Sequence, residues 1–245
     1  MHVLDNRVLD NPVWHALTGP HSTLAEHAPR AARYQPDVSV FGGIADDATP
    51  EAWDDLRELI GPGGGIVLTR GDLRIPTGRL QLPESWQVFR NLPCRQMWLL
   101  GDLTVPPRAG DPRAEAVEYS TLGPADVPEM LELVGRTKPG PFVTRTVELG
   151  TYLGVREGGE LVAMAGERLH PPGFTEISAV CTDASQRGRG LASCLVEAIV
   201  DGIRARGELP FLNLTRENET AHRLYASLGF ETRALPDVIG VRAPD

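Results

Sequence analysis

The feature that most constrains this chain is the segment Q-R-G-R-G-L-A, residues 186–192, which separates a predicted strand from a predicted helix. The residues before it, 174–182, are rich in β-branched and aromatic side chains and follow a Pro-Pro-Gly break, which is typical of a strand. After it, apolar residues recur at helical spacing from Leu191 to about Gly202. The segment therefore opens a helix.

A helix that begins in this way favours anion binding. Its first turn presents unpaired backbone N–H groups and the positive end of the helix dipole. Gly188 and Gly190 let an anion approach that backbone without a Cβ in the way, and Arg187 and Arg189 add positive charge. Glycine and arginine also serve simple turn geometry, so the segment alone leaves a phosphate role and a structural role equally open. It matches neither the nucleotide-binding P-loop nor the dinucleotide fingerprint.

The segment does match the pattern R-x-x-G-x-[GA], at Arg187, Gly190 and Ala192. In this it resembles the pyrophosphate loop of the GNAT superfamily of N-acetyltransferases, which use acetyl-coenzyme A. A second motif of that superfamily follows in N-E-T-A-H-R-L-Y-A-S-L-G-F, residues 218–230, in which Asn218 is a predicted helix N-cap. Two motifs in the expected order identify the region from Ala114 to the C-terminus as a member of this superfamily.

The resemblance implies an α/β (α+β) fold with a mixed, mostly antiparallel sheet flanked by helices. The residue patterns predict its elements independently, by alternation in strands and by helical spacing in helices. In chain order these are a strand at 114–120, a helix at 124–134, a hairpin of 152–156 and 161–165, a strand at 174–182, a helix from 191, a strand at 209–215, a helix from 218, and strands at 230–234 and 238–241.

The first part of the chain is predicted to be a second, smaller α/β domain. Residues 104–113, T-V-P-P-R-A-G-D-P-R, hold three prolines and a glycine and form the predicted linker. We therefore predict domains at 1–110 and 114–245. Some members of the superfamily carry a degenerate copy of their own fold ahead of the active one, and this is the hypothesis for residues 1–110. The elements predicted there are strands at 38–41, 66–69 and 97–100 and a helix at 49–60.

The resemblance also implies which residues bind acetyl-CoA. In the superfamily, the strand before the loop splays from its neighbour and turns backbone N–H groups toward the cosubstrate, which assigns Val180, Cys181 and Thr182 here. Asn218 has two compatible roles, as an N-cap and as a ligand, because an amide side chain has two polar atoms. The loop itself supplies the pyrophosphate contacts, through Arg187, Gly188, Arg189, Gly190, Leu191, Ala192 and Ser193.

Acetyl transfer from a thioester to an amine requires a neutral amine, a stabilised oxyanion and a proton for the leaving thiolate. The resemblance makes Tyr225 the proton donor, although its apolar helix face would by itself indicate core packing. Glu176 resembles the general base of members that acetylate protein lysines, and strand alternation predicts that it shares a face with Ser178 and Val180. A solvated strand carboxylate, Glu167 as the base, and a water chain without a single base are left open.

The acceptor is harder to predict than the cosubstrate. In the superfamily, the region that corresponds to residues 136–146 borders the acceptor pocket, which implies that Phe142 lines that pocket here. A purely structural role for this proline-rich segment is left equally open. His222 is interpreted as a surface histidine because its helix face differs from that of Tyr225. A net charge of −9 argues against nucleic acid as a partner and suits a cationic or neutral amine.

The remaining composition indicates a cytoplasmic protein. Cys94, Cys181 and Cys194 are widely spaced and lack the partners of a metal site or a disulfide framework. No predicted segment has the length and hydropathy of a membrane span or a signal peptide. A homodimer is left open. The predicted function is acetyl-CoA-dependent acetylation of a primary amine, on a small molecule or a peptide, by direct attack. A catalytically silent acyl-CoA-binding module is the alternative.

Overall fold

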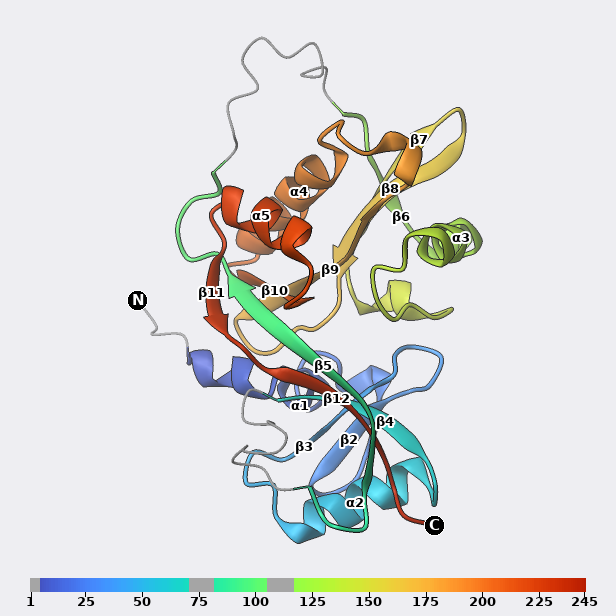
Figure 1. Ribbon diagram of the computed structural model, residues 1–245, viewed down its shortest axis with the longest axis vertical. Coiled ribbons are helices and arrows are strands. Elements are labelled where there is room, and N and C mark those ends of the chain that lie inside the picture. Colours follow the sequence, from blue (N-terminus) through green and yellow to red (C-terminus); the bar gives the residue numbers. More distant parts are fainter. Residues whose placement is uncertain (1–4, 71–81, 105–116) are drawn as a thin grey trace.

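The computed structural model describes residues 5–70, 82–104 and 117–245. Its strands form one continuous sheet in the order β1-β2-β3-β4-β12-β5-β10-β9-β8-β7-β6, and β11 pairs with β5 beside this path (Figure 1). Two of the described strand pairs, β3 with β4 and β9 with β10, are parallel, and the others are antiparallel. The sheet is therefore mixed and mostly antiparallel, as the sequence predicts.

The C-terminal half follows the predicted order of elements closely. The hairpin between β7 and β8 turns at Gly158 and Gly159, whose φ angles of 58° and 91° suit the left-handed positions of a tight turn. The elements are β6 (Ser120–Leu122), α3 (Val127–Thr137), β7 (Tyr152–Glu157), β8 (Glu160–Glu167), β9 (Phe174–Thr182), α4 (Leu191–Ala205), β10 (Leu209–Thr215), α5 (Glu219–Ser227), β11 (Glu231–Ala234) and β12 (Asp237–Arg242).

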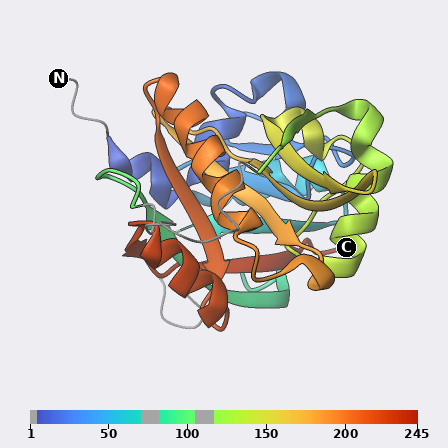
Figure 2. The ribbon, with the colours of Figure 1, turned by 90° about the horizontal axis from the view of Figure 1, so that it is seen from above.

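Helices cover both faces of this half. Strand alternation sends Leu153 of β7 into the core beneath α4 and α5, while the preceding Tyr152 enters the core beneath α3. Leu195 and Ile199 of α4 lie one turn apart and are both buried against the sheet. Burial of such side chains stabilises the layer by roughly 1.5 to 3 kcal/mol each. Figure 2 shows α4 and α3 on different sides of the strands.

The N-terminal half contains more elements than the sequence predicts. The helix α2 begins at Pro50 after the N-cap Thr49 and ends before Gly61, as predicted. The strand predicted at 38–41 lies three residues later, at β3 (Phe41–Ile44). The other elements are α1 (Pro12–Leu17), β1 (Ala25–His27), β2 (Ala31–Tyr34), β4 (Gly65–Arg70) and β5 (Gln87–Trp98).

The shift of β3 has a physical cause. Its middle residues are Gly42 and Gly43, which have low strand propensity and conceal the strand in the sequence. Tertiary contact explains the glycine at 43, because a Cβ there would lie 2.7 Å from the backbone nitrogen of Trp14. The close approach of α1 to the sheet therefore requires glycine in a strand that propensity alone would reject.

Two long strands join the halves. The end of β5 pairs with β10 from Cys94 to Trp98, while its beginning pairs with β12. In turn, β12 pairs with β4, so the last strand of the chain completes the sheet of the N-terminal half (Figure 1). Most of the predicted linker and the start of the strand predicted at 114–120 lie outside the described residues. The division into two domains stays a prediction, and the described strands show that the two halves interleave.

Candidate active site

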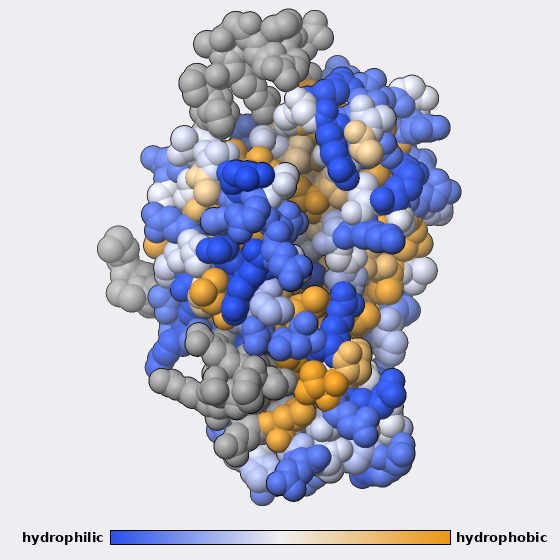
Figure 3. Space-filling view, in the orientation of Figure 1, coloured by the Kyte–Doolittle hydropathy of each residue, from blue (hydrophilic) through white to orange (hydrophobic). Residues whose placement is uncertain are grey.

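A cavity of about 880 Å³ lies between the two halves and is lined by both. One end is formed by β9, the 186–193 loop and α5, and the other by residues of β3, β4, β5 and β12. The face of the molecule in Figure 3 carries a hollow bordered largely by hydrophilic residues, between the helices of the C-terminal half.

The strand β9 opens toward this cavity because it separates from β10. Parallel pairing ends at Ile177 opposite Leu212, and no later pair joins the two strands among the described residues, although both continue. Ala179 has a left-handed φ of 53°, and the pairing with β8 shifts register between Met164 and Gly166. This β-bulge ends the regular sheet and leaves the β10-facing edge of β9 without a strand partner.

The same bulge corrects the predicted orientation of Glu176. Regular alternation would place Glu176 on the same face as Val180. Both Ile177 and Val180 pack against the core beneath α4, so the alternation reverses at Ala179. Glu176, which precedes Ile177, therefore faces the opposite side of the sheet from Val180.

Glu176 is fully buried and held by three donors. Its carboxylate accepts hydrogen bonds from Nε and Nη2 of Arg168, at 2.8 and 2.7 Å, and from Nδ2 of Asn213 at 2.8 Å. Burial disfavours the charge on Arg168, but Glu176 outweighs this effect and holds the pKa of the guanidinium above its ordinary value. Arg168 and Asn213 line the cavity and Glu176 does not. The Glu176 carboxylate is therefore engaged by charge-assisted hydrogen bonds and lies outside the cavity lining.

Glu167, the alternative base, is also outside the cavity lining. It is 2% exposed and accepts hydrogen bonds from Arg206 Nη2 at 2.7 Å and from the backbone N–H of Thr151 at 3.0 Å. Among the described residues, no aspartate or glutamate lines the cavity. His222 lies outside it too, with its Nδ1 3.6 Å from Glu219.

The loop and the start of α4 have the geometry of an anion site. Gly188 and Gly190 adopt φ angles of 78° and 76°, which glycine accepts readily, and Gly190 is the N-cap of α4 with no side-chain cap. Arg189 turns away and pairs with Glu157. The other predicted cosubstrate residues all line the cavity, namely Val180, Cys181, Thr182, Arg187, Gly188, Gly190, Leu191, Ala192, Ser193 and Asn218.

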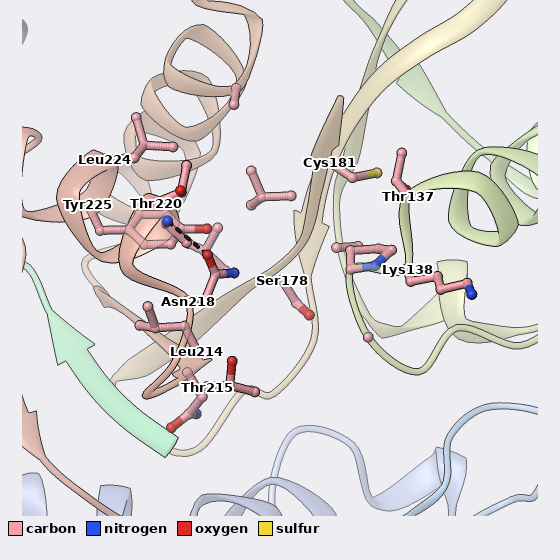
Figure 4. Close-up of a pocket in the computed structure, with 18 of the residues that line it drawn as sticks. Thr137, Lys138, Ser178, Cys181, Leu214, Thr215, Asn218, Thr220, Leu224 and Tyr225 are labelled. Carbon is pink, nitrogen blue, oxygen red and sulfur yellow. Dashed lines mark hydrogen bonds between the residues drawn. The ribbon is translucent and has the colours of Figure 1, made fainter. Parts of the chain in front are cut away.

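The helix α5 presents Asn218 and Tyr225 to the same cavity (Figure 4). Asn218 Oδ1 accepts the backbone N–H of Ala221 at 3.0 Å, which confirms the predicted N-cap and leaves Nδ2 for another partner. The Tyr225 ring packs edge-on against Phe230, and its hydroxyl makes no hydrogen bond within the described part of the chain. Burial raises the pKa of Tyr225 well above its ordinary value, so this hydroxyl stays protonated at neutral pH.

The end of the cavity away from the 186–193 loop contains residues that the sequence does not predict. Phe41, Val67, Leu92, Val238 and Arg90 come from four strands that no motif connects, and these strands meet only in the folded sheet.

The predicted acceptor segment, 136–146, contributes only in part. Residues 137–141 line the cavity, but Phe142 is 9% exposed and packs edge-on against Tyr152 in the core beneath α3. Phe142 therefore belongs to the structural part of that segment.

No helix in residues 5–70, 82–104 or 117–245 has the length and hydropathy to cross a membrane. Within the same ranges, no group of three or more His, Cys, Asp or Glu side chains is placed to hold a metal ion.

A split parallel strand pair, a glycine-rich loop at a helix start and a cavity along both define an acetyltransferase-type fold. Comparison with known proteins supports this class. A crystal structure from Novosphingobium aromaticivorans, assigned to the GNAT family of acetyltransferases, is 36% identical, with a TM-score of 0.80 over 97% of this chain and 99% of that chain. The chain belongs to the GNAT family. The family model of FR47-like proteins matches residues 152–236.

Two mycobacterial relatives match different lengths of the chain. The Mycobacterium leprae protein ML0378 is 31% identical over 82% of this chain, and the match spans 58% of its own length. The N-alpha-acetyltransferase RimI of Mycobacterium tuberculosis is 33% identical over 48% of this chain and 80% of its own length.

Proposed function

We propose that the protein transfers an acetyl group from acetyl-CoA to a primary amine of a small molecule or a peptide. The observation that carries the proposal is one cavity shared by an uncapped helix start, the open edge of β9 and the hydroxyl of Tyr225. Each of these meets one requirement of the reaction, namely anion binding, polarisation of a carbonyl group and donation of a proton. The M. tuberculosis relative is named for acetylation of an α-amine, which supports an amine acceptor.

The residues present fit acetyl-CoA. Gly188, Gly190 and the first turn of α4 would bind the pyrophosphate through backbone N–H groups, with Arg187 beside them. The Thr182 hydroxyl lines the cavity and is buried without a hydrogen-bond partner among the described residues, so it can serve a bound ligand. When bound, acetyl-CoA supplies an acetyl group activated as a thioester.

Tyr225 is the proposed proton donor to the leaving thiolate. Its hydroxyl is protonated at neutral pH and is not committed to another group of the described chain, so its proton is available to a ligand in the cavity. The N–H groups on the open edge of β9, from Val180 to Thr182, are the proposed donors that polarise the acetyl carbonyl.

Removal of the proton from the acceptor amine is assigned to water. Glu176 is the base that the sequence favours, but its three hydrogen bonds and its place outside the cavity lining favour a positioning role. Through these bonds it fixes Arg168 and Asn213, which do line the cavity. Direct attack by a neutral amine leaves one surplus proton on its nitrogen, and water is the proposed acceptor of that proton.

The test is a thiol-release assay with acetyl-CoA and a panel of primary amines, run beside a calorimetric measurement of acetyl-CoA binding. Turnover with at least one amine, together with its loss in Tyr225→Phe, would support the proposal. Tight binding of acetyl-CoA with no turnover on any amine would support a silent binding module instead.

A further inference from the structure

The end of the cavity away from the phosphate loop has an unusual charge for a site that takes amines. Arg90, Lys138, Arg168 and Arg187 line the cavity, whereas no carboxylate does so among the described residues. The whole chain carries a net charge of −9, so its composition does not predict a cavity whose charged lining residues are all basic. Arg187 lies at the phosphate loop, whereas Arg90 lies on β5 and Arg168 directly follows the end of β8.

Arg168 lines the cavity, and two neighbouring side chains hold its guanidinium in place. Its Nε and Nη2 are bound side-on by Glu176, and its carbon Cζ lies 5.0 Å from the centre of the Phe41 ring. Nη1 has no hydrogen-bond partner within the described residues, although the side chain is only 13% exposed. A guanidinium fixed on two sides is pre-organised to bind an anion with the third.

Arg90 supplies a second and less constrained positive charge. It is exposed on β5, opposite Gly240 of β12, and forms no ion pair with any residue that the structure describes. Around these two arginines the wall is apolar, with Phe41, Val67 and Val238. This end of the cavity therefore combines an anion site with an apolar surface.

A simple alkylamine suits this end poorly. Such an amine is a cation in water. Arg90 would repel it, and Glu176 cannot attract it, because that carboxylate is buried outside the cavity lining and already pairs with Arg168. An amine that also carries an anionic group is attracted by the arginines through that group. The same positive charges favour the neutral form of its amine, which is the nucleophile that direct attack requires.

Asn213 can orient that amine. Because a carboxylate only accepts hydrogen bonds, the amide nitrogen of Asn213 must be the atom that faces Glu176. Its Oδ1 is then left for a ligand, and Asn213 lines the cavity on β10, beside the open edge of β9. A carbonyl oxygen in this position accepts a hydrogen bond from an N–H group.

On the basis of the proposed function, we infer that the acceptor is a small amine that carries an anionic group and an apolar body, as an apolar amino acid does. Arg168 and Arg90 bind the anionic group, and Phe41, Val67 and Val238 contact the apolar part. The N-terminal half therefore shares the selection of the acceptor with Arg168 of the C-terminal half.

The experiment uses acceptors matched in shape. Leucine and phenylalanine are compared with their carboxamides, with the amines that lack the carboxyl group and with the corresponding aminophosphonates, at saturating acetyl-CoA. Because the amine pKa differs among these compounds, kcat/KM is measured across pH and compared per neutral amine. We expect the anionic acceptors to exceed the carboxamides at least tenfold. The ratio of carboxylate to phosphonate then tells which anion the arginines fit.

Arg90→Gln should lower kcat/KM for the anionic acceptors about tenfold and leave the carboxamides nearly unchanged. Arg242→Gln is the matched control, because Arg242 is exposed on the neighbouring strand and outside the cavity lining. Arg168→Gln combined with Glu176→Gln removes both members of the buried pair without leaving an unpaired charge, and it should also reduce the preference. Thermal melting of each variant checks that it folds.

The outcomes separate the two proposals. If carboxamides are acetylated as well as the acids, or Arg90→Gln lowers both equally, the inference is wrong and the acetyltransferase function stands. If no amine is acetylated, the proposed function fails. In that case, calorimetric binding of N-acetylleucine against its carboxamide still tests the anion site, because equal affinities would overturn it and a preference for the acid would support it.

Discussion

The two ends of the cavity are built in different ways. The cosubstrate end comes from short continuous segments, with an open strand edge, a helix start and a helix that carries Tyr225. The proposed acceptor end collects Phe41, Arg90 and Val238 from separate strands, together with Arg168 from the segment after β8. Main-chain groups suit a cosubstrate that is the same in related enzymes, while side chains suit an acceptor that differs between them. The N-terminal half can therefore change acceptor selection without disturbing the cosubstrate end.

The largest expected effect lies at the proposed cosubstrate end, at Tyr225. Tyr225→Phe removes one hydroxyl that has no partner in the described chain, so it should leave stability and acetyl-CoA affinity nearly unchanged. Loss of a positioned proton donor should lower kcat by about 100-fold or more. Steady-state kinetics with the best acceptor measures this. Tyr119→Phe, at a tyrosine that is 47% exposed and outside the cavity lining, is the control. A kcat within threefold of the parent protein would remove Tyr225 from the mechanism.

A negative charge at the start of α4 should disable the cosubstrate end alone. Ala192→Glu places a carboxylate in the first turn, where the helix dipole stabilises it but a pyrophosphate is repelled. We expect acetyl-CoA affinity to fall about 100-fold by calorimetry while the melting temperature holds or rises. Ala184→Glu adds the same charge nearby, at an exposed position outside the lining. Equal losses in both variants would show that general charge, not the helix start, is responsible.

The contact between the halves should make stability depend on pH. His21 Nε2 donates to the carbonyl oxygen of Leu149 at 3.1 Å, so its Nδ1 must accept the hydroxyl of Tyr34, at 2.7 Å. Burial, assisted by the nearby His170, lowers the pKa of His21 to about 4. The unfolded chain, with a histidine pKa near 6.5, takes the proton first as pH falls. Stability is therefore complete above pH 6.5 and is lost between pH 6.5 and 4.

Urea unfolding at pH 7.5 and 4.5 measures this loss. The parent protein should lose about 2 to 3 kcal/mol more between the two pH values than His21→Gln does. His27→Gln, at an exposed histidine, should keep the parent's pH dependence. If His21→Gln loses as much stability as the parent, protonation of His21 does not couple to the contact between the halves.

Gly188 should be required for its backbone conformation and not because a side chain there would clash with neighbouring atoms. A Cβ at Gly188 would meet nothing within 4 Å, but its φ of 78° is left-handed. Gly188→Ala should therefore lower the free energy of unfolding by about 1 kcal/mol. Gly135→Ala, within α3 and equally unobstructed, should instead raise it by up to about 1 kcal/mol. Chemical denaturation distinguishes the two signs, and a stabilised Gly188→Ala would contradict the conformational argument.

The smallest effect is expected at His222, which lies within the second motif but outside the cavity lining. His222→Gln should leave kcat and KM within twofold of the parent values across pH 6 to 9. A shift of the pH profile would show that this histidine exchanges protons with the site after all.

Residues that act through the local main chain could be predicted from the sequence. The loop at 186–193 and the N-cap Asn218 depend on neighbours a few positions away, and the structure brings all of them except Arg189 to the cavity. The resemblance places Arg189 in the pyrophosphate loop, but its long side chain pairs with Glu157, which lies far away in the sequence.

Residues whose surroundings depend on distant strands were predicted poorly. The side of the sheet that Glu176 faces, relative to Val180, depends on the bulge at Ala179. The sequence around Ala179 does not reveal this bulge, because the residue types there are compatible with a regular strand. Arg168 belongs to no motif, because its importance comes from Glu176 of β9 and Phe41 of β3, which contact it only in the folded protein.

The sequence by itself determined the order of elements in the C-terminal half, the phosphate loop and the helix that carries Tyr225. These follow from hydrophobic periodicity, caps and glycine positions, which act over one or two turns of chain. Only the tertiary structure decided that β5 and β12 join the halves and that arginines and apolar side chains of several strands share one end of the cavity. Side chains distant in sequence meet only when the sheet forms, so no local pattern records the pairing.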